Sequence, residues 1–255
     1  MHFARKYRPP IIVLENVNGA PWQEIKDVWE EENYAADFLK LDTKQYYIPH
    51  TRQRVYMVCI DKQNFESANV SVKKWAQLMG DFERPASCSI ESFLLNDDDP
   101  RVQMAREQLA KGSRGEDRGP REVDWTRCQG RHQDYRASLQ LGTLIPATSW
   151  VNGGSCKMPD FSDLAWSHNQ VERVWDTIDI SCLRNATRGF DSWFKLRVWE
   201  LSQNIDRFTD TAPFGITGCI TPTGQPFITT RGGPLLGLEA LAMQGLPIEQ
   251  ANTHT

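Results

Sequence analysis

Hydrophobic positions near the start of the chain predict a strand followed by a helix. Residues 11–14 form a continuous apolar run after two prolines, which is typical of a short buried strand. In residues 22–32, apolar side chains recur at helical spacing and share one face. That face consists of Trp22, Ile25, Val28 and Trp29. We therefore expect a buried strand at 11–14 and an amphipathic helix at 22–32.

Two further apolar stretches complete this pattern. Residues 38–41 and 55–60 lie on either side of a turn-like sequence at 47–51. A strand, a helix and then two strands is the order expected for the closing part of an α/β sheet.

The middle of the chain, residues 63–215, has weak periodicity and frequent aromatic side chains, so we expect it to be rich in loops. Residues 192–203 are the exception, because their tryptophans and leucines fall near one helical face and predict a helix. Residues 111–136 carry more basic than acidic side chains. That segment is either a solvated loop or a contact for phosphate groups.

The end of the chain again has a regular pattern. Residues 216–230 predict two short strands joined at 222–225 by a Pro-Thr-Gly-Gln turn. A short helix is expected at 236–243, followed by the helix-stopping Gly245 and Pro247. Three regions follow from these patterns: 1–62, 63–215 and 216–255.

The composition is that of an ordinary globular protein. Of the 255 residues, 40% are apolar and 24% are charged, and this apolar content is enough to form a core. The sequence has no apolar run long enough to span a bilayer. The net charge of −4 argues only weakly against a nucleic-acid partner, because enzymes acting on DNA can confine positive charge to one cleft. Six cysteines lack any Cys-x-x-Cys spacing, which indicates reduced thiols rather than a zinc site or disulfides.

The first candidate for chemistry is Glu15-Asn16-Val17, directly after the apolar run at 11–14. A carboxylate at the carboxyl end of such a strand lies where α/β sheets bind their ligands. The alternative is an exposed acid at the end of a strand, which the tripeptide alone does not exclude.

The second candidate is the pair Arg52 and Arg54, two residues apart at the start of the strand expected at 55–60. Side chains two positions apart on a strand point to the same face, and guanidinium groups hold carboxylates, phosphates and base edges well. Two solvated arginines at the edge of a sheet are the alternative. A third segment, 231–247, joins a glycine-rich turn to a short apolar helix and is by itself typical of packing.

Together and in this order, these segments resemble the DNA (cytosine-5)-methyltransferase family, whose blocks include Glu-Asn-Val, Gln-x-Arg-x-Arg and Glu-x-x-Arg-x-x-Gly-Phe-Pro. Residues 15–17 match the first block in full, and His50 replaces Gln in the second. The third match is looser, because Ala242 stands at the family's arginine. The remaining residues that fit this block are Glu239, Gln244, Gly245, Leu246 and Pro247.

The resemblance implies an α/β fold, namely the C-terminal portion of a Rossmann-like sheet of an S-adenosylmethionine-dependent methyltransferase, plus a loop-rich target-recognition region. Residues 1–62 would form the closing part of the methyltransferase core, 63–215 the target-recognition region, and 216–255 a return segment to the core with a short helix. DNA is the partner that the resemblance implies.

The resemblance also implies roles for the candidate residues. Glu15 would hydrogen-bond N3 of a cytosine flipped out of the duplex and read its exocyclic amine. Arg54, with Arg52 beside it, would bind O2 of the base and nearby groups. Asn16, with Val17, would support the site by holding the neighbouring catalytic loop. The family cofactor is S-adenosylmethionine, and no metal is implied.

Several family motifs are missing from these 255 residues. There is no Pro-Cys dipeptide to supply the nucleophile and no Phe-x-Gly-x-Gly loop for the cofactor. We therefore expect a partial catalytic domain that neither binds S-adenosylmethionine well nor methylates DNA alone, and whose incomplete sheet exposes apolar edges and lowers solubility. The alternatives are a non-catalytic DNA-binding or split-enzyme partner, an RNA cytosine methyltransferase, and an unrelated α/β protein. An intracellular protein is expected, nuclear if the source is a eukaryote.

Overall fold

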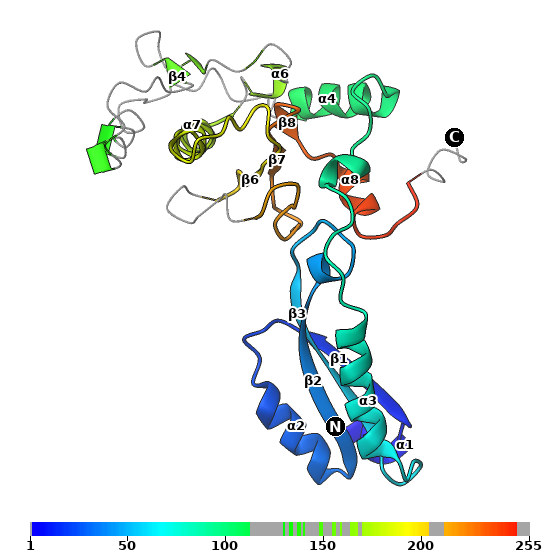
Figure 1. Cartoon of the computed structure of the whole chain (residues 1–255). Helices are drawn as coiled ribbons and strands as arrows, with labels where there is room; N and C mark the ends of the chain where they lie inside the picture. The colour runs from blue at the N-terminus through cyan, green and yellow to red at the C-terminus, as the bar shows by residue number, and fades with distance from the viewer. Residues whose placement is uncertain are drawn as a thin grey trace. The chain divides into compact units, whose positions relative to one another are not determined.

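The computed structural model of the chain is shown in Figure 1, and it describes residues 2–112, 170–203 and 212–248, with short pieces between 130 and 167. The chain divides into two compact units, Met1–Ser87 and Cys88–Thr255. Both combine helices with small sheets, so the fold is of the mixed α/β class.

A three-stranded antiparallel sheet forms the centre of the first unit. Its strands are β1 (Ile11–Asn16), β2 (Tyr34–Asp42) and β3 (Gln53–Asp61), in the order β1-β3-β2. β3 pairs antiparallel with both of its neighbours. All three strands that the sequence predicts are confirmed, and each extends beyond its predicted apolar run, β2 by the most because it begins at Tyr34.

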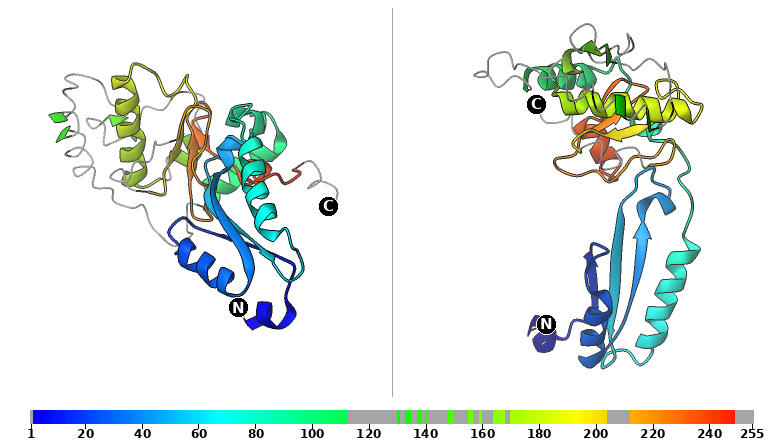
Figure 2. Two further views of the ribbon diagram at one scale, coloured as in Figure 1. Left: turned by 60° about the horizontal axis from the view of Figure 1, so that its bottom comes forward. Right: turned by 90° about the vertical axis from the view of Figure 1, so that its left-hand side faces the viewer.

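Helices cover the two faces of this sheet, as the two views of Figure 2 show. α2 (Trp22–Glu31), which confirms the predicted helix, packs on one face through Trp22 and Trp29. α3 (Ala68–Asp81) packs on the other face, against β2 and β3. A short helix, α1 (His2–Tyr7), precedes β1.

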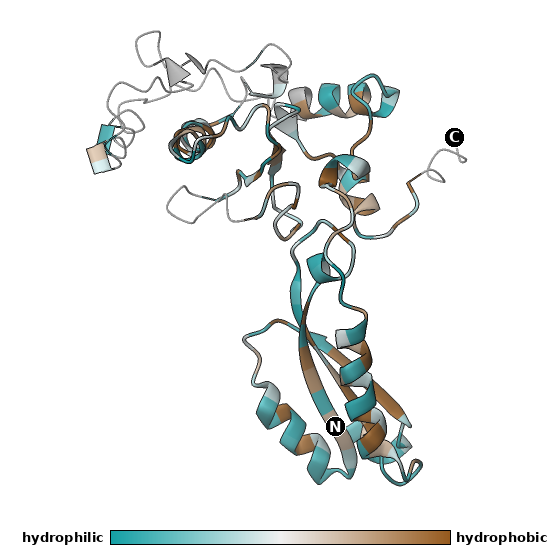
Figure 3. Ribbon diagram, in the orientation of Figure 1, coloured by the Kyte–Doolittle hydropathy of each residue, from teal (hydrophilic) through white to brown (hydrophobic). Residues whose placement is uncertain are grey.

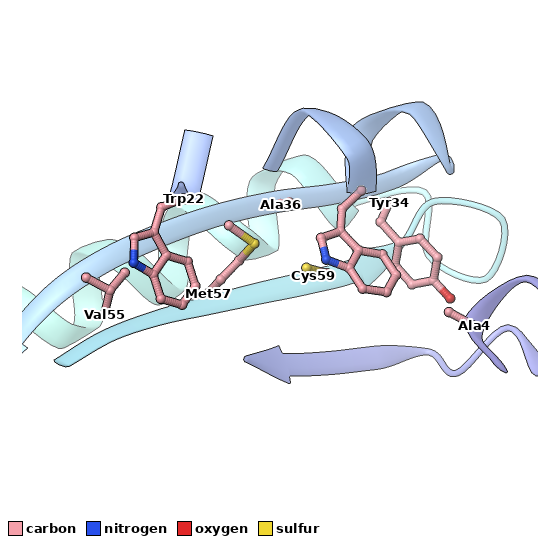
Figure 4. Close-up of a cluster of buried hydrophobic side chains, with 8 residues drawn as sticks. Ala4, Trp22, Tyr34, Ala36, Val55, Met57 and Cys59 are labelled. Atoms are coloured by element: carbon pink, nitrogen blue, oxygen red, sulfur yellow. The ribbon is translucent and has the colours of Figure 1, made fainter. Parts of the chain in front are cut away.

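The main core of the first unit lies between α2 and the sheet (Figure 4). Alternate residues of β3 point into it, and Met57 and Cys59 are fully buried. Trp29 stands edge-on to Tyr34 with ring centroids 5.3 Å apart. Large aromatic rings fill this layer and pack against one face of β3. Because β3 also carries Arg54, this packing fixes the position of the strand that presents Arg54.

The other face of β1 is exposed, which corrects the expectation of a fully buried strand. Ile11 and Val13 are 55% and 63% exposed, because α3 packs over β2 and β3. Among the described residues, β1 pairs only with β3, so its outer edge has no strand beside it. Figure 3 shows the apolar residues of β1 in brown.

The second unit is built around a small sheet of three short strands: β6 (Val198–Glu200), β7 (Pro226–Ile228) and β8 (Gly233–Pro234). A long helix, α7 (Glu172–Thr187), precedes β6. The other described elements are η2 (Ile90–Phe93), α4 (Pro100–Gly112), the strand pair β4 (Thr148–Ser149) and β5 (Ser155–Cys156), α6 (Leu164–Ser167) and α8 (Gly237–Ala242). Trp199 and Phe227 stack at the centre of the second unit, with ring centroids 5.9 Å apart.

The predicted helix at 192–203 is wrong. This segment is a turn followed by β6, in which Val198 and Trp199 point into two different clusters. When both faces of a short strand are buried, its apolar run has the same spacing as a buried helix. In the segment 216–230 only β7 is a strand, whereas α8 confirms the helix predicted at 236–243.

Candidate functional site

Glu15 and Arg54 form an ion pair on neighbouring strands of the first unit. Glu15 lies opposite Tyr56 in the β1–β3 register, which brings its side chain beside that of Arg54. The Arg54 Nε atom is 3.1 Å from Glu15 Oε1, and the two side chains are 21% and 43% exposed. Arg54 also donates from Nη1 to the Gln53 carbonyl at 2.7 Å, which limits the rotation of the guanidinium group. The structure therefore places two predicted site residues in contact, at a position that solvent reaches.

The turn after β1 is held by local hydrogen bonds. The Val17 N–H donates to Asn16 Oδ1 at 2.8 Å, and the Trp22 indole donates to the Val17 carbonyl at 3.1 Å. Asn18 Nδ2 donates to Gln53 Oε1 at 3.2 Å, joining this turn to the start of β3. Asn16 thus fixes the backbone beside Glu15, while the Val17 side chain is exposed.

Asp42, at the end of β2, organises the start of β3. Its Oδ1 atom accepts from the Arg52 backbone N–H at 3.1 Å, and its Oδ2 atom accepts from Gln53 Nε2 at 3.3 Å. Its carboxylate is nearly buried, and Lys44 Nζ lies 3.7 Å from Oδ2. No sequence motif singled out Asp42. The available signal was its position as an acid that ends a strand before the two arginines.

His50, which replaces the family's glutamine, is buried just before β3. Its N–H donates to the Ile48 carbonyl at 2.8 Å, and its own carbonyl accepts the Thr43 hydroxyl. Burial lowers the pKa of the imidazole, and the nearby Arg52 charge lowers it further, against a smaller opposite effect of Asp42. His50 is therefore a neutral side chain at neutral pH.

A cavity of about 370 Å³ lies on the sheet face that carries Glu15 and Arg54. Arg52 lines this cavity, whereas Arg54 forms the ion pair with Glu15. The other residues that line the cavity are Val13, Leu41, Thr43, Tyr46, Ile48, Tyr56, Val58, Trp75 and Met79. No carboxylate lines it, so it lacks the acidic groups that would hold the ribose hydroxyls and the amino group of S-adenosylmethionine. These residues do not fit that cofactor.

Cys59, the one cysteine in the sequence of the first unit, is no nucleophile for a base at Glu15. Cys59 is fully buried in the core behind β3, and burial raises the pKa of its thiol to about 12. A thiol with that pKa is protonated at neutral pH and unreactive. In the described part of the chain, no three His, Cys, Asp or Glu side chains gather as a metal site would require. No described helix has the length and apolar character needed to cross a bilayer.

The third sequence segment forms a buried ion pair within the second unit. Arg231 donates from Nη1 to Glu239 Oε2 at 2.8 Å, and the two side chains are 6% and 0% exposed. Glu239 Oε1 accepts the Leu95 N–H and Arg231 Nη2 donates to the Leu95 carbonyl, both at 2.8 Å. The pair therefore ties α8 to the chain after η2. The basic segment 111–136 lies almost entirely outside the described residues, so its two interpretations stay open.

Comparisons with known proteins identify the family. Residues 1–114 match the model of the C-5 cytosine-specific DNA methylases. The chain is 43% identical, over 98% of its length, to the DNA (cytosine-5-)-methyltransferase DMT5 of Cryptococcus neoformans. It is 30% identical, over 99% of its length, to the protein of the same name from Verticillium dahliae. The chain spans 10% and 11% of the length of these two relatives. It belongs to the C-5 cytosine-specific DNA methylase family.

Proposed function

We propose that this chain is part of a DNA (cytosine-5)-methyltransferase, which transfers a methyl group from S-adenosylmethionine to C5 of a flipped cytosine. The observation that carries this proposal is the ion pair between Glu15 and Arg54, at 3.1 Å on adjacent strands. Both residues come from segments that match the family's blocks, 39 positions apart in the chain.

In this function the ion pair binds the target base. Arg54 holds Glu15 by one carboxyl oxygen, Oε1, which leaves Oε2 to face N3 and the exocyclic amine of cytosine. A protonated Glu15 would donate to N3 and offset the negative charge that develops on the ring when a thiolate adds to C6. Arg54 would donate to O2 from the same side. Arg52 would support this end of the cavity, and Asn16 would keep the adjoining turn in place.

The family uses S-adenosylmethionine, which supplies the methyl group when bound. The apolar cavity on the same sheet face as Glu15 does not fit it, and these 255 residues contain no Pro-Cys dipeptide and no Phe-x-Gly-x-Gly loop. We infer that the cofactor cradle and the cysteine nucleophile come from residues outside this sequence. These 255 residues alone would then transfer no methyl groups.

We further infer that the β1-β3-β2 sheet is the closing part of a larger Rossmann-like sheet. The outer edge of β1 has no strand beside it among the described residues, and its apolar Ile11 and Val13 are exposed. Additional strands on that edge and a helix over that face would bury them. In this arrangement residues 1–62 belong to the methyltransferase core, 63–215 to target recognition, and 216–255 to a segment that returns to the core.

DNA is the proposed partner, and a eukaryotic source would place the protein in the nucleus, where the genome is methylated. An RNA substrate and a non-catalytic DNA-binding or split-enzyme role remain the competing functions. The intact Glu15–Arg54 contact supports catalysis, because binding to DNA alone does not require an acid in a base pocket.

The test is the variant Glu15→Gln in the protein as its source encodes it. We expect methyl transfer to DNA, followed with labelled S-adenosylmethionine, to fall by roughly 100-fold or more, which is the size of a general-acid contribution. Glu24→Gln, an exposed acid in the first turn of α2, is the control and should keep full activity.

Retention of activity in the Glu15→Gln variant would overturn the assigned role. A parent protein that binds DNA but never methylates it would favour the non-catalytic alternative. Preferential methylation of RNA would favour the RNA enzyme.

A further inference from the structure

Phe194 is an exposed aromatic side chain on an otherwise well-packed loop. The loop comprises residues 188–197, between α7 and β6, and is called the Phe194 loop below. The Phe194 side chain is 83% exposed, the highest value among the large apolar side chains that the structure describes. Burial of a phenylalanine side chain stabilises a fold, so the exposed Phe194 ring adds little stability to this unit alone.

The Phe194 loop is fixed by contacts on both sides of the exposed ring. Trp193, the preceding residue, packs edge-on against Trp199 with ring centroids 6.0 Å apart. Asp191 accepts the Trp193 N–H at 2.8 Å through Oδ1 and the Lys195 N–H at 3.0 Å through its carbonyl. Asn185 Nδ2 donates to Ser192 Oγ at 2.8 Å in a buried position. The backbone on both sides of Phe194 is therefore held in place, so little backbone freedom is lost when the ring binds a partner.

Basic residues flank Phe194 in the sequence, and of those on the Phe194 loop Arg188 and Lys195 are exposed whereas Arg197 is buried. Lys195 follows Phe194 directly, and its ammonium group lies 3.9 Å from the centre of the Phe214 ring. The Arg197 guanidinium lies 4.7 Å from the same ring. Between residues 184 and 197 there are four basic side chains and one acidic side chain, Asp191, which already accepts a backbone N–H. The four basic residues are Arg184, Arg188, Lys195 and Arg197.

This combination fits a polyanion that also offers flat apolar groups. Lysine and arginine neutralise backbone phosphates, whereas exposed aromatic rings stack on bases or wedge between base steps. An acidic protein surface would match the charge, but it would not require a ring held out on a fixed loop. DNA is the partner that uses both features.

We propose that the Phe194 loop is a DNA-binding element, in which Phe194 packs against bases while Lys195 and Arg188 contact phosphates. The proposal rests on the proposed function, because DNA is the substrate of the enzyme described above. It goes further by naming the residues of the proposed target-recognition region that contact DNA, and it is tested by binding rather than by catalysis.

The experiment measures the affinity of the protein, as its source encodes it, for a labelled duplex over a series of salt concentrations. Phe194→Ala should weaken binding by roughly 5- to 100-fold, the range found when base stacking is lost, with an unchanged salt dependence. Lys195→Gln should lower the slope of log affinity against log salt by about 0.9, as expected for one lost phosphate contact. Phe194→Tyr keeps an aromatic ring and should retain most of the affinity.

The matched control is Phe82→Ala, which removes another exposed phenylalanine, 61% exposed at the end of α3. Circular dichroism and tryptophan fluorescence show whether each variant is folded. Unchanged DNA affinity in folded Phe194→Ala would overturn the proposal, even with methyl transfer intact, and would assign the loop to a protein contact. A loss equal to that of Phe82→Ala would overturn it as well. Failure of the proposed enzyme function is read separately, from the Glu15→Gln assay.

Discussion

The site depends on one buried carboxylate that contacts no substrate in the proposed function. Asp42 fixes the backbone of Arg52 and the side chain of Gln53, and so sets where β3 begins. Arg54 is the next residue of β3, and its side chain contacts Glu15 on β1. The position of Arg54 is thus set by a residue on β2, a strand that carries no family motif.

Asp42→Ala should lower the free energy of unfolding by about 1.5–3 kcal/mol, because it leaves a buried N–H donor without its charged acceptor. It should also reduce the rate of methyl transfer, since Arg54 loses its fixed position. Asp37→Ala is the control on the same strand, because Asp37 makes a partly exposed pair with Lys26 at 3.4 Å and otherwise accepts only the N–H of its neighbour Phe38 at 3.0 Å. We expect a cost below about 1 kcal/mol there. Urea unfolding measures both, and equal costs would contradict the role of Asp42.

His50 makes the stability of the first unit depend on pH. Its pKa in the folded protein is below the ordinary value of 6.5, so the unfolded chain takes up a proton first as the pH falls. The stability is therefore present above about pH 6.5 and is lost as the pH falls below that value towards the lowered pKa. His50→Gln, which restores the family's residue, should flatten this loss. Unfolding free energies measured between pH 7.5 and pH 5, in roughly half-unit steps, test it. An identical pH profile in the variant would rule out His50 as the cause.

At the scale of elements, some of the structure was predictable from the pattern of the chain. α2 was predicted because its apolar side chains recur at helical spacing on one face, and the strands of the first unit because each contains a short apolar run beside turn residues. β6 was misread as a helix because Val198 and Trp199 are buried on both sides of the strand. β1 was predicted as buried because an apolar run does not show whether another element covers it.

The site could be predicted only in part. Glu15, Arg52 and Arg54 were found from family motifs and strand positions, and the structure brings Glu15 and Arg54 into contact. Asp42 could not be found, because its role depends on the pairing of β2 with β3. Their catalytic roles stay predictions until the Glu15→Gln assay.

The contact between α8 and the chain after η2 depends on the buried ion pair of Arg231 and Glu239. Glu239→Ala removes the buried carboxylate from the Arg231 guanidinium and leaves only the exposed Asp97, 3.4 Å from Nε, so it should destabilise the second unit by about 3 kcal/mol. The double variant Arg231→Met with Glu239→Leu should recover most of that loss, because no buried charge remains. Thermal and urea unfolding compare the two. Glu91→Ala, an exposed acid in η2, is a neutral control. A double variant as unstable as the single one would contradict this account.

At the scale of the whole molecule, the exposed face of β1 should be covered in the protein as its source encodes it. Val13→Lys should then lower the free energy of unfolding by roughly 1.5–3 kcal/mol, the value of a buried aliphatic side chain. Val70→Lys is the control, because Val70 on α3 is also exposed, at 67%, and should change stability by less than about 0.5 kcal/mol.

The 255 residues by themselves should give the opposite result. There, Val13→Lys should change stability by less than about 0.5 kcal/mol and raise solubility, because the apolar face of β1 is mostly exposed to water. If Val13→Lys and Val70→Lys change stability equally, both in the protein as its source encodes it and in the 255 residues alone, nothing covers β1.

The pairing of β1 has a consequence for synthesis on the ribosome. Ile11 pairs with Ile60 and Asn16 with Val55, whereas β2, which is made in between, lies on the far side of β3. At about 5–20 residues per second, the apolar run of β1 waits several seconds for its partner strand to be translated. During that interval an unpaired, aggregation-prone apolar segment is exposed on the nascent chain. The speed of elongation through β2 and β3 therefore affects how much of the protein reaches its native state.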